Sequence, residues 1–279
     1  MDVQPTQCLN IACVEKAAMA LGFSYSFFDK NKNFIEVKTP YGPKTFINCT
    51  SPANQSDLVR LAEDKEFTYL FLSSHINMPR TIGYFDPDAL AEFDQYKNFH
   101  SQEDIAIDIS HKFELPVIIK MNNGSQGRNV FKCESINDIR RALKKIYNKK
   151  SKNYDYVALA QEFVLIKTEY RVVVLNNQIK FAYEKDISRA VFTGNLSPLH
   201  YENAQAVLVT DQHRLGELAS FLSPVFSKLK IGLAGLDVAE TTNGKFVLFE
   251  LNTQPGFSAF DHDNDDKLIV ELYKKLLQS

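Results

Sequence analysis

The sequence predicts a mixed fold of helices and strands, and three observations lead to this expectation. Apolar residues recur with helical spacing in some segments and form short β-branched runs in others, so the two element types alternate along the chain. Residues 169–184 contain two such runs around Asn176-Asn177, which is typical of an antiparallel hairpin and excludes a purely parallel sheet. The 279 residues, 44% of them hydrophobic and 24% charged, are enough for one large domain or two to three small ones.

The first part of the chain is predicted to contain two helices and two strands. Residues 11–21 have helical spacing and stop at Gly22, a residue type that often follows a helix end. Short strands are expected at residues 34–37 and 44–49, on either side of a Pro-Tyr-Gly-Pro turn. A second helix is expected over residues 56–75, with Ser56 or Asp57 as its N-cap.

The remaining elements continue the alternation. A strand at residues 115–121, a glycine-containing loop and a strand at 129–134 precede a helix over 135–147, which Ser135 or Asn137 would cap. Further strand-like runs, separated by one helix at about 211–229, are expected at residues 156–165, in the hairpin at 169–184, and at 233–241 and 244–252.

Composition narrows the classes of partner and location. A net charge of -2 gives no electrostatic reason to expect a nucleic acid or an anionic membrane as partner. No apolar run reaches the ~18 residues of a membrane span, and the first residues lack a secretory pattern. The chain is therefore expected to be cytoplasmic. Cys8, Cys13, Cys49 and Cys133 form no C-x-x-C pair and are interpreted as small buried side chains rather than metal ligands or disulfides.

Residues 121–131 form a glycine-containing loop between two predicted strands. Because Gly124 and Gly127 do not open a helix, such a loop would hold phosphate through backbone N–H groups alone, as a flap. A plain flexible turn is the alternative interpretation. Lys120 ends the apolar strand directly before the loop, where its ammonium could reach a phosphate.

Two carboxylates and one amide lie in the last two predicted strands. Asp237 and Glu250 flank a Thr-Asn-Gly turn at residues 242–244, and Asn252 shares a strand face with Glu250. Both carboxylates lie in apolar runs, and a buried carboxylate without a partner is costly, so exposed surface acids are the weaker interpretation. Oxygen ligands of this kind suit Mg²⁺, and the set Asp237, Glu250 and Asn252 is predicted to bind it.

Five segments, taken in order, resemble the ATP-grasp superfamily, most closely its RimK-like and glutathione-synthetase-like carboxylate-amine ligases. They are RLAEDKEFTYLFLSSHINMPRT, PVIIKMNNGSQGRNVF, YVALAQEFVLIKTEYRVVVL, EKDISRAVFTGNL and the metal set followed by TQPGF, within residues 51–279. The resemblance implies an α+β ATP-grasp fold in which two subdomains, residues 56–165 and 166–279, grip ATP. A shortened N-terminal domain, residues 1–55, would precede them.

The resemblance also implies roles for individual residues. The backbone of Glu162 and Val164 would bind adenine, and Glu169 would hold the ribose hydroxyls. The residues that would contact ATP are Lys65, Lys120, Gly124, Ser125, Gln126, Gly127, Gln161, Glu162, Phe163, Val164 and Glu169. Those that would act in catalysis are Lys185, Arg189, Asn195 and Arg171, with the two arginines as candidates for gripping a substrate carboxylate.

The activity that the resemblance implies is an ATP-dependent ligation of a carboxylate to an amine through an acylphosphate, with Mg²⁺ or else Mn²⁺ as the cation. An amino acid or peptide is the expected substrate class, and a homodimer is an expected assembly because similar ligases often dimerise. Two departures leave the acceptor open: Thr193 stands where arginine is frequent, and the loop after Leu196 does not match. A small-molecule kinase on the same scaffold and a nucleotide-binding module without turnover are the alternatives.

Overall fold

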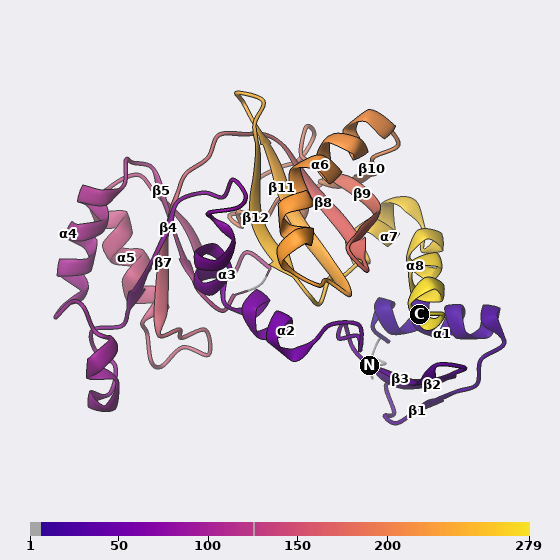
Figure 1. Cartoon of the computed structure of the whole chain (residues 1–279). Coiled ribbons are helices and arrows are strands. Elements are labelled where there is room, and N and C mark those ends of the chain that lie inside the picture. Colours follow the sequence, from indigo (N-terminus) through magenta and orange to yellow (C-terminus); the bar gives the residue numbers. More distant parts are fainter. Residues whose placement is uncertain (1–6, 125) are drawn as a thin grey trace.

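The computed structural model describes residues 7–124 and 126–279, which form three antiparallel sheets with helices packed against them (Figure 1). The five-stranded sheet lies between the other two. The mixed α+β fold is therefore as predicted from the sequence.

The three-stranded sheet follows the first helix. Helix α1 (Leu9–Leu21) ends at Gly22, whose φ of 69° is left-handed and suits glycine. The strands that follow, in the order β1-β2-β3, are β1 (Tyr25–Phe27), β2 (Phe34–Thr39) and β3 (Gly42–Ile47).

The four-stranded sheet has the order β4-β7-β5-β6 and carries two helices against it. Its strands are β4 (Thr81–Phe85), β5 (Val117–Met121), β6 (Val130–Cys133) and β7 (Val157–Glu162). Apolar side chains of α4 (Gln102–Lys112) and α5 (Ile136–Ile146) fill the core with those of the strands, while the 3-10 helix η1 (Ala91–Tyr96) follows β4. Ser135 caps α5 by accepting a hydrogen bond from the backbone of Asp138. Of the two predicted caps, Ser135 and Asn137, the first is therefore confirmed.

The five-stranded sheet has the order β10-β9-β8-β11-β12. Its strands are β8 (Ile166–Leu175), β9 (Gln178–Asp186), β10 (Gln205–Leu208), β11 (Leu233–Thr241) and β12 (Phe246–Asn252). The predicted hairpin joins β8 to β9 through Asn176 and Asn177, whose φ values of 53° and 56° match the two left-handed positions of a tight hairpin turn. Between β9 and β10 lies the 3-10 helix η2 (Pro198–His200).

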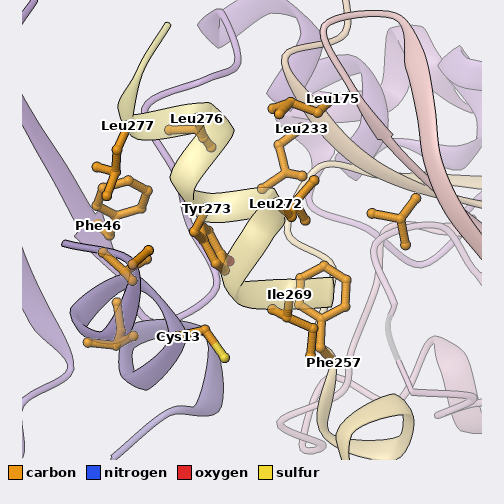
Figure 2. Close-up of a cluster of buried hydrophobic side chains, with 14 of the residues drawn as sticks. Cys13, Phe46, Leu175, Leu233, Phe257, Ile269, Leu272, Tyr273, Leu276 and Leu277 are labelled. Carbon is orange, nitrogen blue, oxygen red and sulfur yellow. The ribbon is translucent and has the colours of Figure 1, made fainter. Parts of the chain in front are cut away.

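Each face of this sheet has its own apolar core. On one face, α2 (Ser56–Glu63), α3 (Lys65–Leu72) and α6 (Gln212–Lys228) pack against alternate residues of the strands. On the other face, α7 (Ser258–Asn264) and α8 (Lys267–Leu277) form one core with α1 and the three-stranded sheet. Figure 2 shows this second core, where Phe46 of β3 and Tyr273 of α8 meet edge to face with ring centroids 5.9 Å apart. The first and last parts of the described chain thus share a core.

The prediction of a single helix over residues 56–75 is wrong. The chain forms two short helices, α2 and α3, because Asp64 takes an extended conformation and its side chain accepts a hydrogen bond from the backbone of Phe67. Neither Ser56 nor Asp57 is the N-cap of α2: Gln55 occupies that position and makes no side-chain cap bond. The break places Lys65 in the first turn of α3.

Candidate functional site

The two predicted carboxylate ligands are neighbours across paired strands. In the antiparallel pair β11–β12, Asp237 lies opposite Glu250 and Gly235 lies opposite Asn252. Opposed residues of such a pair point to the same face of a sheet, and so do residues two apart. Asp237, Glu250 and Asn252 therefore project from one end of the strands on one face, as the sequence predicts.

Asp237 is buried and is held by two cations. Arg171, directly opposite it on β8, donates from Nε to Oδ1 and from Nη2 to Oδ2, the second bond measuring 3.0 Å. The Nζ of Lys185 on β9 lies 2.9 Å from Oδ1. Burial alone would raise the pKa of Asp237, but the two cations outweigh it and lower the pKa to about 2. The carboxylate therefore stays ionised at any pH at which the protein would work.

The positions of Arg171 and Lys185 depend on a glycine and on carboxylates next to them. A Cβ on Gly235 would lie 2.8 Å from Cδ of Arg171 and 3.2 Å from Cβ of Pro255, so only glycine leaves room for the arginine stem. Lys185 also donates to Glu169, and although its burial would lower its pKa, Asp237 and Glu169 raise it. Lys185 is consequently a buried side chain that stays positively charged.

Lys120 comes to the site from the other sheet. It lies in β5, one residue before the end of the strand, is buried, and donates from Nζ to Oε1 of Gln161 on β7 across 2.9 Å. Gln161 in turn donates from Nε2 to the hydroxyl of Thr81 on β4, also across 2.9 Å. Burial lowers the pKa of Lys120 to about 8. The chain of hydrogen bonds orients an ammonium that is partly deprotonated in mild base.

Helix α3 carries Lys65 to the space between the two sheets. Asp64 caps the helix, and Lys65, the next residue, has its Nζ 3.2 Å from Oε1 of Glu250 while also donating to the carbonyl of Gly124 in the glycine loop. One lysine thus contacts elements of both sheets. The pocket at this point, about 310 Å³ including the part open to solvent, is lined by Ala62, Lys65, Thr68, Tyr69, Met78, Thr81, Lys120, Leu159, Gln161, Phe249, Glu250 and Leu251.

The glycine loop connects β5 to β6, which pair as an antiparallel hairpin, in agreement with the prediction. Asn195, from the segment between β9 and β10, donates from Nδ2 to the carbonyl of Gln126 across 3.0 Å. A Cβ on Gly127 would lie 1.9 Å from Oδ1 of Asn195, so glycine permits this approach. Gly124 packs its backbone against Met121, and Ser125 lies outside the described residues.

The segment predicted to bind adenine connects β7 to β8 and so joins the two sheets. The N–H of Glu162 donates to the carbonyl of Arg80 across 2.9 Å, and the ring of Phe163 lies under Nζ of Lys132, 4.9 Å from its centroid. Val164 is half-buried. These residues lie at the crossing between the two sheets, where a planar base could be read from the backbone.

Arg189 lies apart from the cluster around Asp237. It is exposed, in the segment after β9. It contributes to the low pKa of Asp186, after hydrogen bonds from the backbone and side chain of Ser188. Of the two predicted carboxylate-binding arginines, Arg171 is occupied by Asp237 and Arg189 is the one with its guanidinium at the surface.

The donor set fits a hard divalent cation. Two carboxylates and one amide oxygen share a sheet face, and the Oδ1 of Asn252 accepts a hydrogen bond from the backbone N–H of Gln254. Among the described residues, no group of three or more His, Cys, Asp or Glu side chains gathers as a metal site. The three would hold Mg²⁺ together with phosphate oxygens.

Three positioning residues were missed by sequence reasoning. The Oδ1 of Asn122, just after β5, accepts from the N–H of Glu66, and the carbonyl of Asn122 accepts from Lys65. The carboxylate of Glu66 lies against Gly83, where a Cβ would be 2.0 Å from Oε1. Thr81 supports Gln161. Of these three residues, only Asn122 could have been identified from the sequence, because it lies two residues after Lys120.

Two antiparallel sheets place Lys65, Lys120 and Glu250 in one pocket. The glycine hairpin contacts Lys65, and Asp237 lies opposite Glu250, an arrangement typical of an ATP-grasp protein. The chain belongs to the RimK-like ATP-grasp domain family, which matches residues 92–277. It is 26% identical over 158 residues to a D-alanine–D-alanine ligase of Haemophilus ducreyi, covering 55% of this chain and 50% of that protein. The chain thus spans about half the length of this curated relative.

Solved structures support the fold. A RimK domain ATP-grasp protein of Sphaerobacter thermophilus matches 81% of this chain and 72% of its own, with a TM-score of 0.56 and 15% identity. A bifunctional glutathione synthetase of Pasteurella multocida matches 96% and 44%, with a TM-score of 0.53 and 13% identity. A D-alanine–D-alanine ligase of Coxiella burnetii matches 78% and 58%, with a TM-score of 0.52 and 16% identity. In the part of the chain described here, no helix combines the length and apolarity needed to span a membrane.

Proposed function

We propose that the protein is an ATP-dependent ligase that joins a carboxylate to an amine through an acylphosphate, with an amino acid or peptide as substrate. The observation that carries the proposal is the pocket between the sheets, where Lys65 and Lys120 lie beside Glu250. Glu250 is paired across the strands with Asp237, whose own cations are Arg171 and Lys185. Such an array suits a polyphosphate and its metal ion.

The chain's own residues would act mainly by positioning and charge neutralisation, which is most of what phosphoryl transfer requires. Lys65, Lys120 and Lys185 would offset the charge of the triphosphate, and the loop with Gly124 and Gly127 would exclude water. Magnesium held by Asp237, Glu250 and Asn252 would stabilise negative charge on phosphate oxygens. Glu162 and Val164 would read adenine through their backbone, and Glu169, already joined to Lys185, would accept from the ribose.

The reaction has two steps. A substrate carboxylate oxygen attacks the γ-phosphorus, and the bond from that phosphorus to the bridging oxygen of ADP breaks, which gives an acylphosphate. The amine then attacks the acyl carbon, phosphate leaves with the C–O bond electrons, and the nitrogen loses a proton. Arg189 is the proposed contact for a substrate carboxylate because it is exposed, whereas Arg171 would position Asp237. Asn195 would hold the glycine loop over the acylphosphate.

We place the two gripping subdomains at residues 56–165 and 166–279, after a short N-terminal domain at 1–55. The names of the relatives support the substrate class, since D-alanine–D-alanine ligase and glutathione synthetase are ligases of amino acids and peptides. A homodimer and a cytoplasmic location stay predictions.

The test is an assay of ADP and phosphate release with MgATP against a panel of amino acids and peptides, offered as carboxylates and amines, singly and in pairs. We expect release of ADP and phosphate only when both co-substrates are present, with an amide visible by mass spectrometry. Phosphate retained on a product would instead indicate a kinase. Tight ATP binding without turnover across the panel would indicate a nucleotide-binding module.

A further inference from the structure

Two of the four cysteines, Cys8 and Cys49, lie in contact although they are 41 positions apart in the sequence. The Sγ of Cys8 is 3.8 Å from the Sγ of Cys49, and both residues are half-buried. Cys13 and Cys133, by contrast, have no exposed surface. Cys13 and Cys133 are buried as expected, whereas Cys8 and Cys49 are only half-buried, and none of the four forms a disulfide.

Asn33 holds the two cysteine segments together. Its Oδ1 accepts from the N–H of Cys8 across 2.6 Å, and its carbonyl accepts from the N–H of Asn48 across 2.9 Å. Cys49 lies in a tight turn closed by two backbone hydrogen bonds between Ile47 and Thr50, of 2.8 and 3.1 Å. Hydrogen bonds of the backbone next to each cysteine thus hold the two segments, and with them the two thiols, close together.

The two thiols differ in their surroundings. Cys8 is the N-cap residue of α1. A hydrogen bond from the Cys49 thiol lowers the pKa of Cys8 from 9.0 to about 6. Burial opposes this shift, and the backbone N–H groups of Asn10 and Ile11 add to it. The same contact raises the pKa of Cys49, as does its burial. One member of the pair is therefore a ready nucleophile and the other keeps its proton.

We propose that Cys8 and Cys49 form a reversible thiol-disulfide site, in which Cys8 attacks and Cys49 resolves, with a small disulfide such as oxidised glutathione as the oxidant. The Cys8 thiolate attacks one glutathione sulfur, the S–S bond breaks, and one glutathione thiolate leaves with the electron pair. Cys49 then loses its proton and attacks the Cys8 sulfur, releasing the second glutathione thiol. Two protein thiols are oxidised, and one disulfide is reduced to two thiols.

The site is independent of the proposed ligase activity. Cys8 and Cys49 lie in the helix and turn around the three-stranded sheet, whereas the pocket lies between the other two sheets. A failure of the proposed function would leave the thiol chemistry unaffected, and the reverse also holds.

The experiment uses the full chain with oxidised glutathione at neutral pH. Thiols are counted in denaturant before and after treatment, and a non-reducing proteolytic digest is mapped by mass spectrometry. We expect the count to fall from the four cysteines of the sequence to two, with one cross-linked peptide that joins Cys8 to Cys49 and disappears on reduction. Cys13 and Cys133, which are fully buried, serve as internal controls.

Two variants assign the roles. In Cys49→Ser, treatment should stop at a stable glutathione adduct on Cys8, because the resolving thiol is missing. In Cys8→Ser, Cys49 should react at least about tenfold more slowly than Cys8 does in the wild type, because burial still raises the pKa of its thiol. Four remaining thiols, a link to Cys13 or Cys133, a link between two chains, or a persistent adduct on wild-type Cys8 would each overturn the proposal.

Discussion

The negative charge of Glu250 is balanced by Lys65, whose ammonium lies 3.2 Å from the Glu250 carboxylate. We predict that Glu250→Gln keeps the fold but lowers magnesium-dependent turnover about 100-fold or more. A neutral amide keeps the shape but loses the charge that would hold the metal, a contribution of several kcal/mol to the transition state. Steady-state kinetics over a magnesium titration measures the change.

A matched control is Glu271→Gln, because Glu271 is also paired with a lysine, Lys274, but on the surface of α8. This control should leave turnover unchanged, since exposed ion pairs contribute little. Equal turnover in Glu250→Gln and the control, at ordinary magnesium and saturating ATP, would reject Glu250 as a metal ligand.

Lys120 leads to a prediction about protons. Burial lowers its pKa to about 8 from 10.5, so in mild base the folded protein has partly lost a proton that the unfolded chain retains. Burial of the charged form therefore costs stability below about pH 8, and this cost fades as the pH rises towards 10.5. A bound triphosphate favours the charged form and raises the pKa, so ATP binding at about pH 8.5 should take up a proton.

Calorimetry in two buffers of different ionisation enthalpy measures this uptake. The control is Lys120→Arg, which keeps a positive charge that does not titrate in this range. We expect proton uptake in the wild type and none in the variant. The same uptake in both would show that another group is responsible.

At the scale of elements, the contact between the glycine hairpin and the segment after β9 can be tested with a pair of glycines. Gly127 and Gly194 both have positive φ, 66° and 89°, but only at Gly127 would a Cβ meet another side chain, the Oδ1 of Asn195 at 1.9 Å. Each alanine variant should cost about 1 to 2 kcal/mol of backbone strain. Gly127→Ala should additionally separate the two loops.

The expected consequence of that separation is uncoupling. In Gly127→Ala, ATP should be hydrolysed without amide formation, because water reaches the acylphosphate. In Gly194→Ala, the ratio of amide to ADP should stay as in the wild type. Measuring both products decides the matter, and identical ratios in the two variants would contradict a role for the contact.

The caps of α3 and α5 give a second comparison of elements. Asp64 and Ser135 each accept a hydrogen bond from the backbone at the start of their helices, so either alanine variant should cost about 0.5 to 2 kcal/mol of unfolding free energy. Only Asp64→Ala should also weaken ATP binding, because Lys65 lies in the first turn of α3. Denaturant unfolding and calorimetry separate the two effects. Equal ATP affinity in both variants would show that α3 does not position Lys65.

The strand pairs of the five-stranded sheet that are joined by short turns could be predicted from the sequence, because the turn residues and the flanking apolar runs indicated the same hairpins. The turn at residues 242–244 predicts the β11–β12 pairing that brings Asp237 opposite Glu250, and the Asn176-Asn177 pair predicts the β8–β9 hairpin. Helical spacing of apolar residues continues across Asp64, so this spacing did not predict the break there. The bidentate bond between Arg171 and Asp237 depends on the register of β8 against β11, strands that are distant in sequence.

The whole molecule depends on the core that α1, the three-stranded sheet and α8 share. Phe46 is buried against Tyr273 of α8, whereas Tyr41, in the turn between β2 and β3, is 69% exposed. We predict that Phe46→Ala lowers the unfolding free energy by about 3 to 5 kcal/mol and speeds amide hydrogen exchange in α8. Tyr41→Ala should change the unfolding free energy by no more than about 0.5 kcal/mol and should leave amide exchange in α8 as in the wild type. Unchanged exchange in α8 would show that the two parts are stable independently.

The shared core has a consequence for how the protein is made. Helix α1 is translated long before its packing partner α8, because most of the described chain lies between them. Until then Ile11, Val14 and Phe46 have no α8 to cover them, so the nascent chain carries exposed apolar surface throughout elongation. Docking then closes a very long loop, which slows folding. Chaperone binding during translation should therefore concentrate on α1 and the three-stranded sheet and end when α8 emerges.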